Sequence, residues 1–474
     1  MGVAEIVSGA FFVALAFGLA VAVVLAFGVF MHAERDLGHW ITPMLVPLVV
    51  LGIGLGTLLS HRTLTYASFD IESITSEGEG GGGWTLRIIS FVLVGLCAAK
   101  VFGHLLRRPD RRRASSNLLF ASFVCYFTAG AILNSVFGTH PAFIHNTLYS
   151  VIVFWAAYLA KDEPLTTTID LAKAALLGLL LLSLLVAAIK PELALQPNYR
   201  GWIPGLNFRL WGLGSNPNSI GPLALLLLLL ESMQPSPRRW SRWTGIVTAV
   251  TVLFLSQSKT AWIAAAAAAS VLFWYRHGRA AAGTVFPGLV LLLIGVLATG
   301  TVGLAFVDID NVWHRIALTQ AGNDISTLTG RAQIWAAALD AWRANPLFGY
   351  GPTAWGNSHR FEIGLPFAFS AHNQLMQTLS TAGALGVLML LIYLIALGIG
   401  SSRMADQTRG VSVALLVLVF IRCLTEAPLT FGTILNGDYL THLVLYCIAL
   451  RGYPIAHCTR NAGHILNRQN FPSR

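Results

Sequence analysis

Charged side chains are scarce in this sequence: they make up 11% of the 474 residues, whereas 55% are hydrophobic and the mean hydropathy is +0.66. A soluble chain of this length could not bury so much apolar side chain, which excludes an ordinary water-soluble protein. Because backbone groups in lipid must satisfy their own hydrogen bonds, the apolar runs are predicted to be helices. The expected fold class is therefore all-α, a polytopic membrane bundle of about 12–13 spans with one large external loop.

Cysteines are also few, and other familiar signals are missing. The five cysteines lack the paired spacing typical of a disulfide framework or a zinc site. The N-terminus carries Glu5 and no basic region, so residues 10–31 are expected to remain as a span after maturation. The glycine run in 77–84 lacks the lysine of a phosphate-binding loop, which favours a flexible linker.

The net charge of +10 and the pI near 9.6 come from arginines that gather in alternate short loops. This pattern marks the cytoplasmic side of a membrane protein and contact with membrane lipids, and it argues against a nucleic-acid partner. The clusters are at 107–113, 238–242, 276–279, 403–409 and 451–474.

The expected spans follow from the apolar runs between these clusters. With the arginines inside, three longer segments, 61–87, 190–219 and 307–370, lie outside. Thirteen crossings would place Met1 outside, so the first run or 244–256 is expected not to cross fully. The runs are 10–31, 41–60, 88–106, 117–137, 147–160, 171–189, 220–231, 244–256, 260–275, 285–306, 374–399, 411–424 and 439–450.

The second external segment ends in a strong helix start, because Asn216 is a good N-cap residue and Pro217 needs no amide donor at the first helical position. Free backbone amides at the start of this helix, with Arg209 just upstream, would suit a phosphate. An ordinary capped helix with an interfacial arginine explains the same residues.

The third segment contains an amphipathic helix, predicted from about Arg331 to Asn345 with Thr329 as its cap. Its apolar face predicts that it lies flat in the membrane interface. Arg331 projects from the same face, which points to lipid headgroups or a bound diphosphate, although snorkelling also explains it. The apolar face comprises Ile334, Trp335, Ala338, Leu339 and Trp342.

A candidate base stands where this external segment meets the next span. His372 precedes the run at 374–399, and an imidazole is the side chain suited to accept a proton near neutral pH. Glu426, at the outer end of a later span, is a second candidate base or the carboxylate that orients His372. Arg422 lies one turn before Glu426 and would form an ion pair with it, in a structural or a functional role.

Five motifs in this order resemble the O-antigen ligase and exopolysaccharide polymerase superfamily of bacterial inner membranes, over residues 207–450. They are the segments 208–218, 255–262, 329–335, 346–352 and 371–375.

The resemblance implies a C-type glycosyltransferase architecture with a periplasmic loop at 307–372, and a reaction that needs no metal or cofactor. The donor would be a glycan linked to undecaprenyl diphosphate, used at the periplasmic face with inversion. Arg209 and Arg331 would hold the diphosphate, with Asn216 and Asn218 beside them at the helix start. His372, with Glu426, would activate the acceptor hydroxyl.

The resemblance also divides the chain. Residues 1–206 would form an N-terminal bundle, 207–450 the ligase-like region, and 451–474 a basic cytoplasmic tail. Lys259 departs from the family, which often has arginine there; a lysine keeps the charge but loses the bidentate fork, so its role stays open.

Three functions fit these expectations. A ligase would transfer the glycan to lipid A-core, and a polymerase would transfer it to a second lipid-linked glycan. A lipid-glycan flippase or transporter would need charged residues at mid-membrane depth. Because Lys100 and Lys173 are the main charges within the predicted spans and Arg422 lies nearer a span end, transport ranks third.

Overall fold

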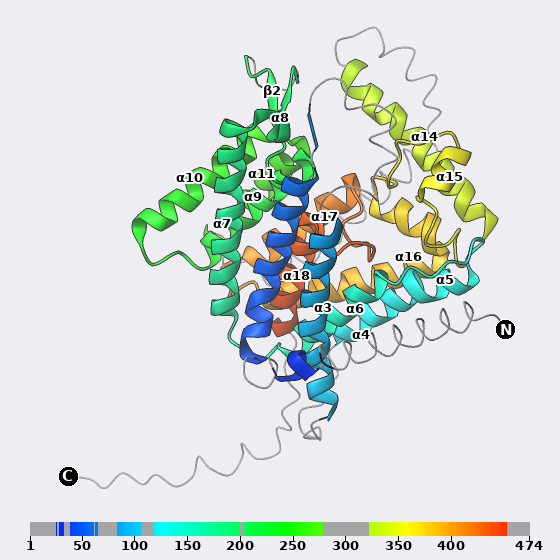
Figure 1. The fold of residues 1–474 in the computed structure, drawn as a ribbon, viewed down its shortest axis with the longest axis horizontal. Helices are drawn as coiled ribbons and strands as arrows, with labels where there is room; N and C mark the ends of the chain where they lie inside the picture. Colours follow the sequence, from blue (N-terminus) through cyan, green and yellow to red (C-terminus); the bar gives the residue numbers. More distant parts are fainter. Residues whose placement is uncertain are drawn as a thin grey trace, which may run out of the picture.

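The protein is described by a computed structural model (Figure 1). The described residues are 38–60, 62–64, 83–106, 118–199, 205–277 and 322–452, with a few others near 30 and at 203; side chains of 322–330 are not included. The expected span at 285–306, most of the span at 10–31, the basic loop at 107–113 and the tail after 452 lie outside these residues.

Helices dominate the described part of the chain. They are Gly38–Leu59, α3 (Gly83–Leu106), α4 (Leu118–Phe127), a π-helix (Thr128–Leu133), α5 (Asn134–Phe137), α6 (Thr147–Leu159), α7 (Leu165–Ile189), α8 (Pro191–Ala194), α9 (Pro217–Met233), α10 (Arg239–Leu255), α11 (Lys259–His277), α14 (Gly322–Ala344), α15 (Asn357–Glu362), α16 (Gln374–Arg403), α17 (Val411–Thr425), α18 (Gly437–Ala449) and a 3-10 turn (Leu450–Gly452). A short antiparallel pair, β1 (Leu195–Pro197) and β2 (Phe208–Leu210), places Gln196 opposite Arg209.

Five helices in the described residues are long and apolar enough to cross a bilayer: Gly38–Leu59, α3, the continuous segment Leu118–Phe137, α7 and α16. Shorter apolar helices are α6, α9 and α17. The expected all-α, polytopic membrane fold is confirmed. Every described span coincides with an apolar run of the sequence, because such a run must adopt a helix in lipid.

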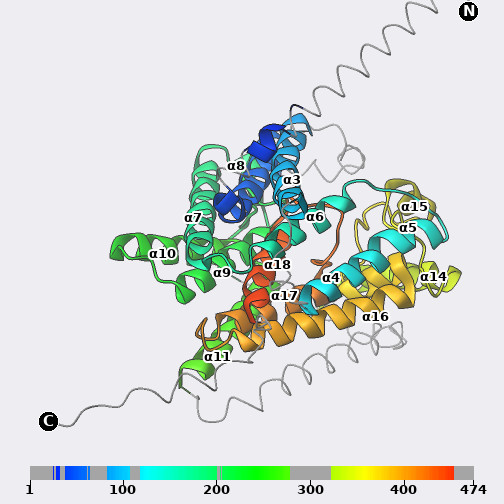
Figure 2. The same cartoon turned by 90° about the horizontal axis from the view of Figure 1, so that it is seen from below.

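One hydrophobic cluster joins helices from both halves of the chain, from Leu45 in the first described span to Leu450 after α18. At its centre α4 and α16 run side by side (Figure 2), and aromatic rings fill the space between them. Phe123 of α4 stacks on Phe154 of α6, and Tyr126 stacks on Tyr393 of α16. This core carries the segments that converge on the polar centre described below.

α16 is broken at Gly383, whose φ of 65° is left-handed. The segment before α15 docks into this break, where the backbone amide of Tyr350 donates to the carbonyl of Ser380 at 2.8 Å. A Cβ at Gly383 would lie 2.5 Å from the Leu347 carbonyl, and a Cβ at Gly349 (φ 74°) would lie 2.7 Å from the Gly383 amide nitrogen. Only two facing glycines allow this contact between backbones.

α14 corrects one expectation, and its apolar face has a partner within the protein. It begins at Gly322, so Thr329 lies inside the helix and does not cap it. Its apolar face exists, but Ile334 and Ala338 are buried against the segment leading into α16, where Met376 belongs to the same cluster. Part of the apolar face therefore packs on protein, and α14 contacts α16 and lies beside α15 (Figure 1).

Both lysines that interrupt the predicted spans are paired near helix ends. Lys100 contacts Glu163 at 2.5 Å and donates to the hydroxyl of Thr42 at 3.0 Å. Lys173 lies 3.5 Å from Glu231 and donates to a backbone carbonyl just after α9. These charges are therefore neutralised within the protein and tie neighbouring helices together.

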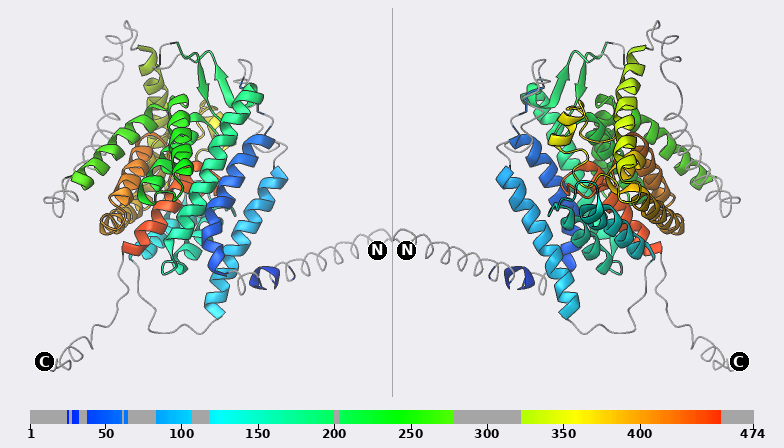
Figure 3. Two further views of the ribbon diagram at one scale, coloured as in Figure 1. Left: turned by 90° about the vertical axis from the view of Figure 1, so that its left-hand side faces the viewer. Right: turned by 90° about the vertical axis from the view of Figure 1, so that its right-hand side faces the viewer.

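The polar centre and the arginines of the short loops lie at different helix ends. The starts of α9, α16 and α18 and the ends of α10 and α17 contribute residues to the polar centre. Figure 3 shows the green strands and the yellow-green helix α14 at the same end of the molecule. The opposite ends of these helices, and the end of α11, carry arginines in or beside the short loops. These are Arg238, Arg239, Arg242, Arg276, Arg403, Arg409 and Arg451.

Candidate active site

The start of α16 orients a histidine toward the bundle. Asn373 caps this helix, because its side-chain oxygen accepts from the amides of Leu375 at 3.0 Å and Met376 at 3.1 Å. His372 precedes the cap with φ of 46°, a left-handed conformation that costs a residue with a Cβ about 1–2 kcal/mol. The His372 amide contacts the hydroxyl of Ser370 at 3.3 Å. Backbone strain of this kind is typical of functional sites.

His372 and Glu426 form a dyad in which Nδ1 of the imidazole lies 2.8 Å from Oε2 of the carboxylate. The His372 side chain is 33% exposed and that of Glu426 is 17% exposed, so the dyad is reachable from outside. Burial would raise the pKa of Glu426, but the hydrogen bond from His372 and the positive charges of Arg422, His372 and Arg331 outweigh it and lower that pKa. Glu426 is therefore a carboxylate at neutral pH.

The two residues after His372 hold the turn that carries Glu426. Asn373 donates from its side-chain amide to the carbonyl of Leu424 at 3.3 Å. Gln374 accepts from the amide of Leu429 at 2.8 Å, and Tyr126 donates to the Leu429 carbonyl at 2.9 Å. Three consecutive residues thus supply the dyad histidine, the helix cap and the support of the facing turn.

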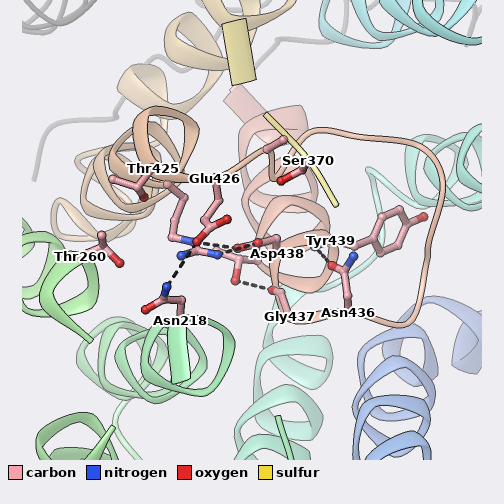
Figure 4. A network of polar contacts seen from close by, with 12 residues as sticks. Asn218, Thr260, Ser370, Thr425, Glu426, Asn436, Gly437, Asp438 and Tyr439 are labelled. Carbon is pink, nitrogen blue, oxygen red and sulfur yellow. Dashed lines mark hydrogen bonds and ion pairs between the residues drawn. The ribbon is translucent and has the colours of Figure 1, made fainter. Parts of the chain in front are cut away.

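A chain of hydrogen bonds extends from the dyad to a cation. Asn218, in the first turn of α9, donates to Oε1 of Glu426 at 3.3 Å (Figure 4). Its own oxygen accepts from the guanidinium of Arg209 at 3.1 Å and from the hydroxyl of Ser258 at 3.0 Å. Arg209 also donates to the Ser256 carbonyl at 2.8 Å, and this contact fixes β2 against the end of α10.

The remaining predicted residues lie around the same point. Pro217 begins α9 as expected, but the Asn216 side chain makes no capping hydrogen bond; it is exposed at the wall of a cavity instead. Arg331 of α14 is half-buried, and its charge acts on Glu426. All six candidate residues from the sequence therefore gather around this dyad.

The expected ion pair between Arg422 and Glu426 is wrong. Arg422 forms a bidentate pair with Asp438 of α18, at 2.8 and 2.7 Å (Figure 4). Glu426 has left the helix, with φ of −149° and ψ of −175°, so the spacing of one helical turn no longer brings the two side chains together. The Arg422–Asp438 pair joins α17 to α18 beside the dyad.

Arg62 is a further cation at this site, and the sequence did not indicate it. Its guanidinium is surrounded by carbonyls of the segment that joins β2 to α9, and it lies 5.3 Å from the centre of the Trp211 ring. Burial lowers its pKa to about 10. In the sequence Arg62 looked like any arginine at a membrane surface, because its partners lie more than a hundred residues away. They are the carbonyls of Leu193, Gly212, Gly214 and Ser215.

Two cavities meet at the dyad. The large cavity, of about 840 Å³, is lined by His372, Arg62 and Asn216, and has an apolar wall from the helix Gly38–Leu59 and α3 that includes Ile53 and Leu86. The small cavity, of about 350 Å³, lies between α4, α6, α16 and the turn after Glu426. Both are within the size range of small-molecule sites. The two share Phe369, Ser370 and Glu426.

The fold and this centre define a polytopic helical membrane protein with a carboxylate–imidazole dyad between two cavities and cations close by. Residues 244–391 match the family described as O-antigen ligase, so this part of the chain is similar to an O-antigen ligase domain, and the resemblance noted from the motifs is confirmed over these residues. Arg331 and His372 lie within the match, whereas Arg209 and Glu426 lie outside it. No curated protein matches the chain. The domain supports ligase- or polymerase-type activity in polysaccharide biosynthesis.

Proposed function

We propose that the protein is a membrane glycosyltransferase that moves a glycan from undecaprenyl diphosphate to an acceptor hydroxyl, in the manner of an O-antigen ligase. The observation that carries this proposal is the dyad of His372 and Glu426, connected through Asn218 to Arg209. A base and a cation close together are what a hydroxyl attack on a sugar diphosphate needs.

The reaction is a direct displacement. Because ionised Glu426 accepts the proton on Nδ1 of His372, Nε2 is left to take the proton of the acceptor hydroxyl. The acceptor oxygen bonds to the anomeric carbon while the bond from that carbon to the phosphate oxygen breaks, and the electron pair leaves with the diphosphate. Arg209 and Arg331 would stabilise the charge on this leaving group, so the mechanism calls for no metal, and the anomeric centre inverts.

The active face would be periplasmic, in a bacterial inner membrane. Support comes from the arginines of the short loops, which lie at the helix ends opposite the dyad, where the positive-inside rule puts the cytoplasm. A donor activated before it reaches this face also agrees with the absence of a nucleotide-binding glycine motif from the sequence.

Transport remains the weaker candidate. Lys100 and Lys173, which would have lined a charged pathway, are bound to carboxylates near helix ends. Arg422 is bound to Asp438 in the same way. A transport pathway needs charges that face the substrate, and these three charges face protein partners instead.

The decisive test is transfer in vitro by purified protein, with a synthetic undecaprenyl diphosphate oligosaccharide as donor and EDTA present. Lipid A-core and a second lipid-linked unit would be offered separately, which distinguishes a ligase from a polymerase. We expect label on one acceptor and a loss of about 10²–10⁴-fold in His372→Ala, the usual contribution of a general base. His145→Ala, an exposed histidine before α6, is the matched control and should keep full activity. No transfer to either acceptor, or equal rates in both variants, would overturn the proposal.

A further inference from the structure

The small cavity differs in chemistry from the large one. Among its described lining residues there is no lysine, arginine or histidine, and two carboxylates, Glu426 and Asp438, stand at its edge. Because such a lining offers no cation to a diphosphate, it favours a neutral ligand. The remaining polar lining consists of hydroxyls and amides. It includes Asn134, Thr147, Ser370, Gln377, Thr381 and Thr430.

Neutral sugars present the groups that such a lining binds. Hydroxyl and amide side chains exchange hydrogen bonds with sugar hydroxyls, and Phe369, Phe431 and Tyr126 add aromatic surface to the same wall. One hydrogen-bond acceptor in this lining has no hydrogen-bond donor within the described residues. Asn134 is 1% exposed and donates to the Thr381 carbonyl, but its oxygen has no partner among the described residues. A buried carbonyl without a donor is unfavourable and calls for a ligand hydroxyl.

The cavity is built from irregular backbone. The π-helix Thr128–Leu133 interrupts α4 along one wall, at Gly130, and Thr381 and Ala382 of the opposite wall come just before the break of α16 at Gly383. A π-helix inserted into an α-helix is frequent at functional sites because it costs stability that packing alone would not retain. Both walls therefore depart from regular helix at the same place.

We propose that the small cavity is the acceptor subsite, and that it binds a neutral sugar unit of the acceptor glycan. This assignment rests on the transferase function proposed above. In an in-line displacement the acceptor hydroxyl approaches from the side opposite the leaving diphosphate. The large cavity has the cation Arg62, the exposed Asn216 and an apolar wall formed by spanning helices, which suit a lipid diphosphate. The acceptor hydroxyl would cross the shared rim at Ser370 and Glu426 to reach His372.

Gly432 offers a direct test. It lines the small cavity and does not line the large one, has no positive φ, and a Cβ added there meets no atom within 4 Å. Gly432→Leu should therefore fill the cavity without disturbing the fold. Gly178→Leu is the matched control, since that glycine of α7 also has open space around its Cβ and lies outside both cavities.

In the transfer assay we expect Gly432→Leu to raise the acceptor KM by about tenfold or more and to leave the donor KM within about twofold, the pattern of lost binding to one substrate. Asn134→Leu, which removes the unpaired carbonyl, should shift the same constant. Gly178→Leu should shift neither.

A rise in the donor KM instead would mean that the donor's sugar occupies the small cavity, and unchanged constants would mean that neither substrate does. Each of these results overturns the assignment of the cavity. The proposed transferase function would still stand, provided that the wild-type protein transfers the glycan. Absence of wild-type transfer overturns both.

Discussion

Glu426 is the residue at which the polar centre converges. One carboxylate oxygen accepts from Asn218 and the other lies against Nδ1 of His372, so a single charge orients the imidazole and connects it to the cation side. Burial opposes this charge, and the neighbouring cations sustain it. A substitution that removes the charge of Glu426 but keeps the shape of its side chain is therefore the most informative test of this residue.

Glu426→Gln should change both the rate and the pH dependence of stability. Because folding lowers the Glu426 pKa below its ordinary value of 4.5, the carboxylate stabilises the protein above that pH and ceases to do so as the pH falls through the lowered pKa. We expect wild-type Tm to fall more steeply with acid than that of the variant, whose amide does not titrate. Transfer at neutral pH should drop by about 10²-fold. Thermal unfolding across the acid range checks the first expectation, and parallel Tm curves would contradict it.

The types of residue in the sequence indicated which side chains lie at this centre, but they did not indicate all of the contacts that these side chains make. His372 and Glu426 stood out because an imidazole and a carboxylate at span ends are unusual. The partner of Arg422 was missed because Asp438 lies 16 residues further on, whereas local helical spacing pointed to Glu426. Arg62 was missed for the same reason. Contacts between distant segments depend on the fold, and no local pattern contains them.

At the scale of elements, apolar runs predicted the helices and their approximate ends, because lipid leaves a buried backbone no alternative. The interruptions were not predicted. The π-helix in α4 and the break at Gly383 depend on backbone from another segment, which a window of sequence does not include. Gly383 and Gly349 looked like ordinary glycines, although each makes room for the other.

Gly383→Ala should therefore disrupt the docking of the segment before α15. The new Cβ would meet the Leu347 backbone at 2.5 Å, in a left-handed conformation that alone costs about 1–2 kcal/mol. We expect a clearly lower Tm and faster proteolysis between α14 and α16. Gly398→Ala, in the same helix, is the control, because its Cβ would meet only Leu416 at an ordinary 3.8 Å. Equal Tm values for the two variants would show that the glycine contact is dispensable.

At the scale of the whole molecule, the arginines of the short loops and the dyad lie at opposite helix ends. The dyad sits where α9, α16 and α18 begin, and the arginines sit where these helices and their neighbours turn back. The short loops after α9, α11, α16 and α18 carry these arginines at the ends away from the dyad. The proposed orientation therefore rests on many residues together and does not depend on any one loop.

This division predicts opposite labelling of two engineered cysteines, in a background from which the five native cysteines have been removed. Asn216→Cys lies at the exposed wall of the large cavity, and Arg409→Cys lies in the turn between α16 and α17. In sealed spheroplasts a membrane-impermeant maleimide should label the first and leave the second unlabelled until the membrane is opened. The reverse pattern would place the dyad on the cytoplasmic side and the arginines of the short loops outside. That arrangement would violate the positive-inside rule and would contradict transfer at the periplasmic face.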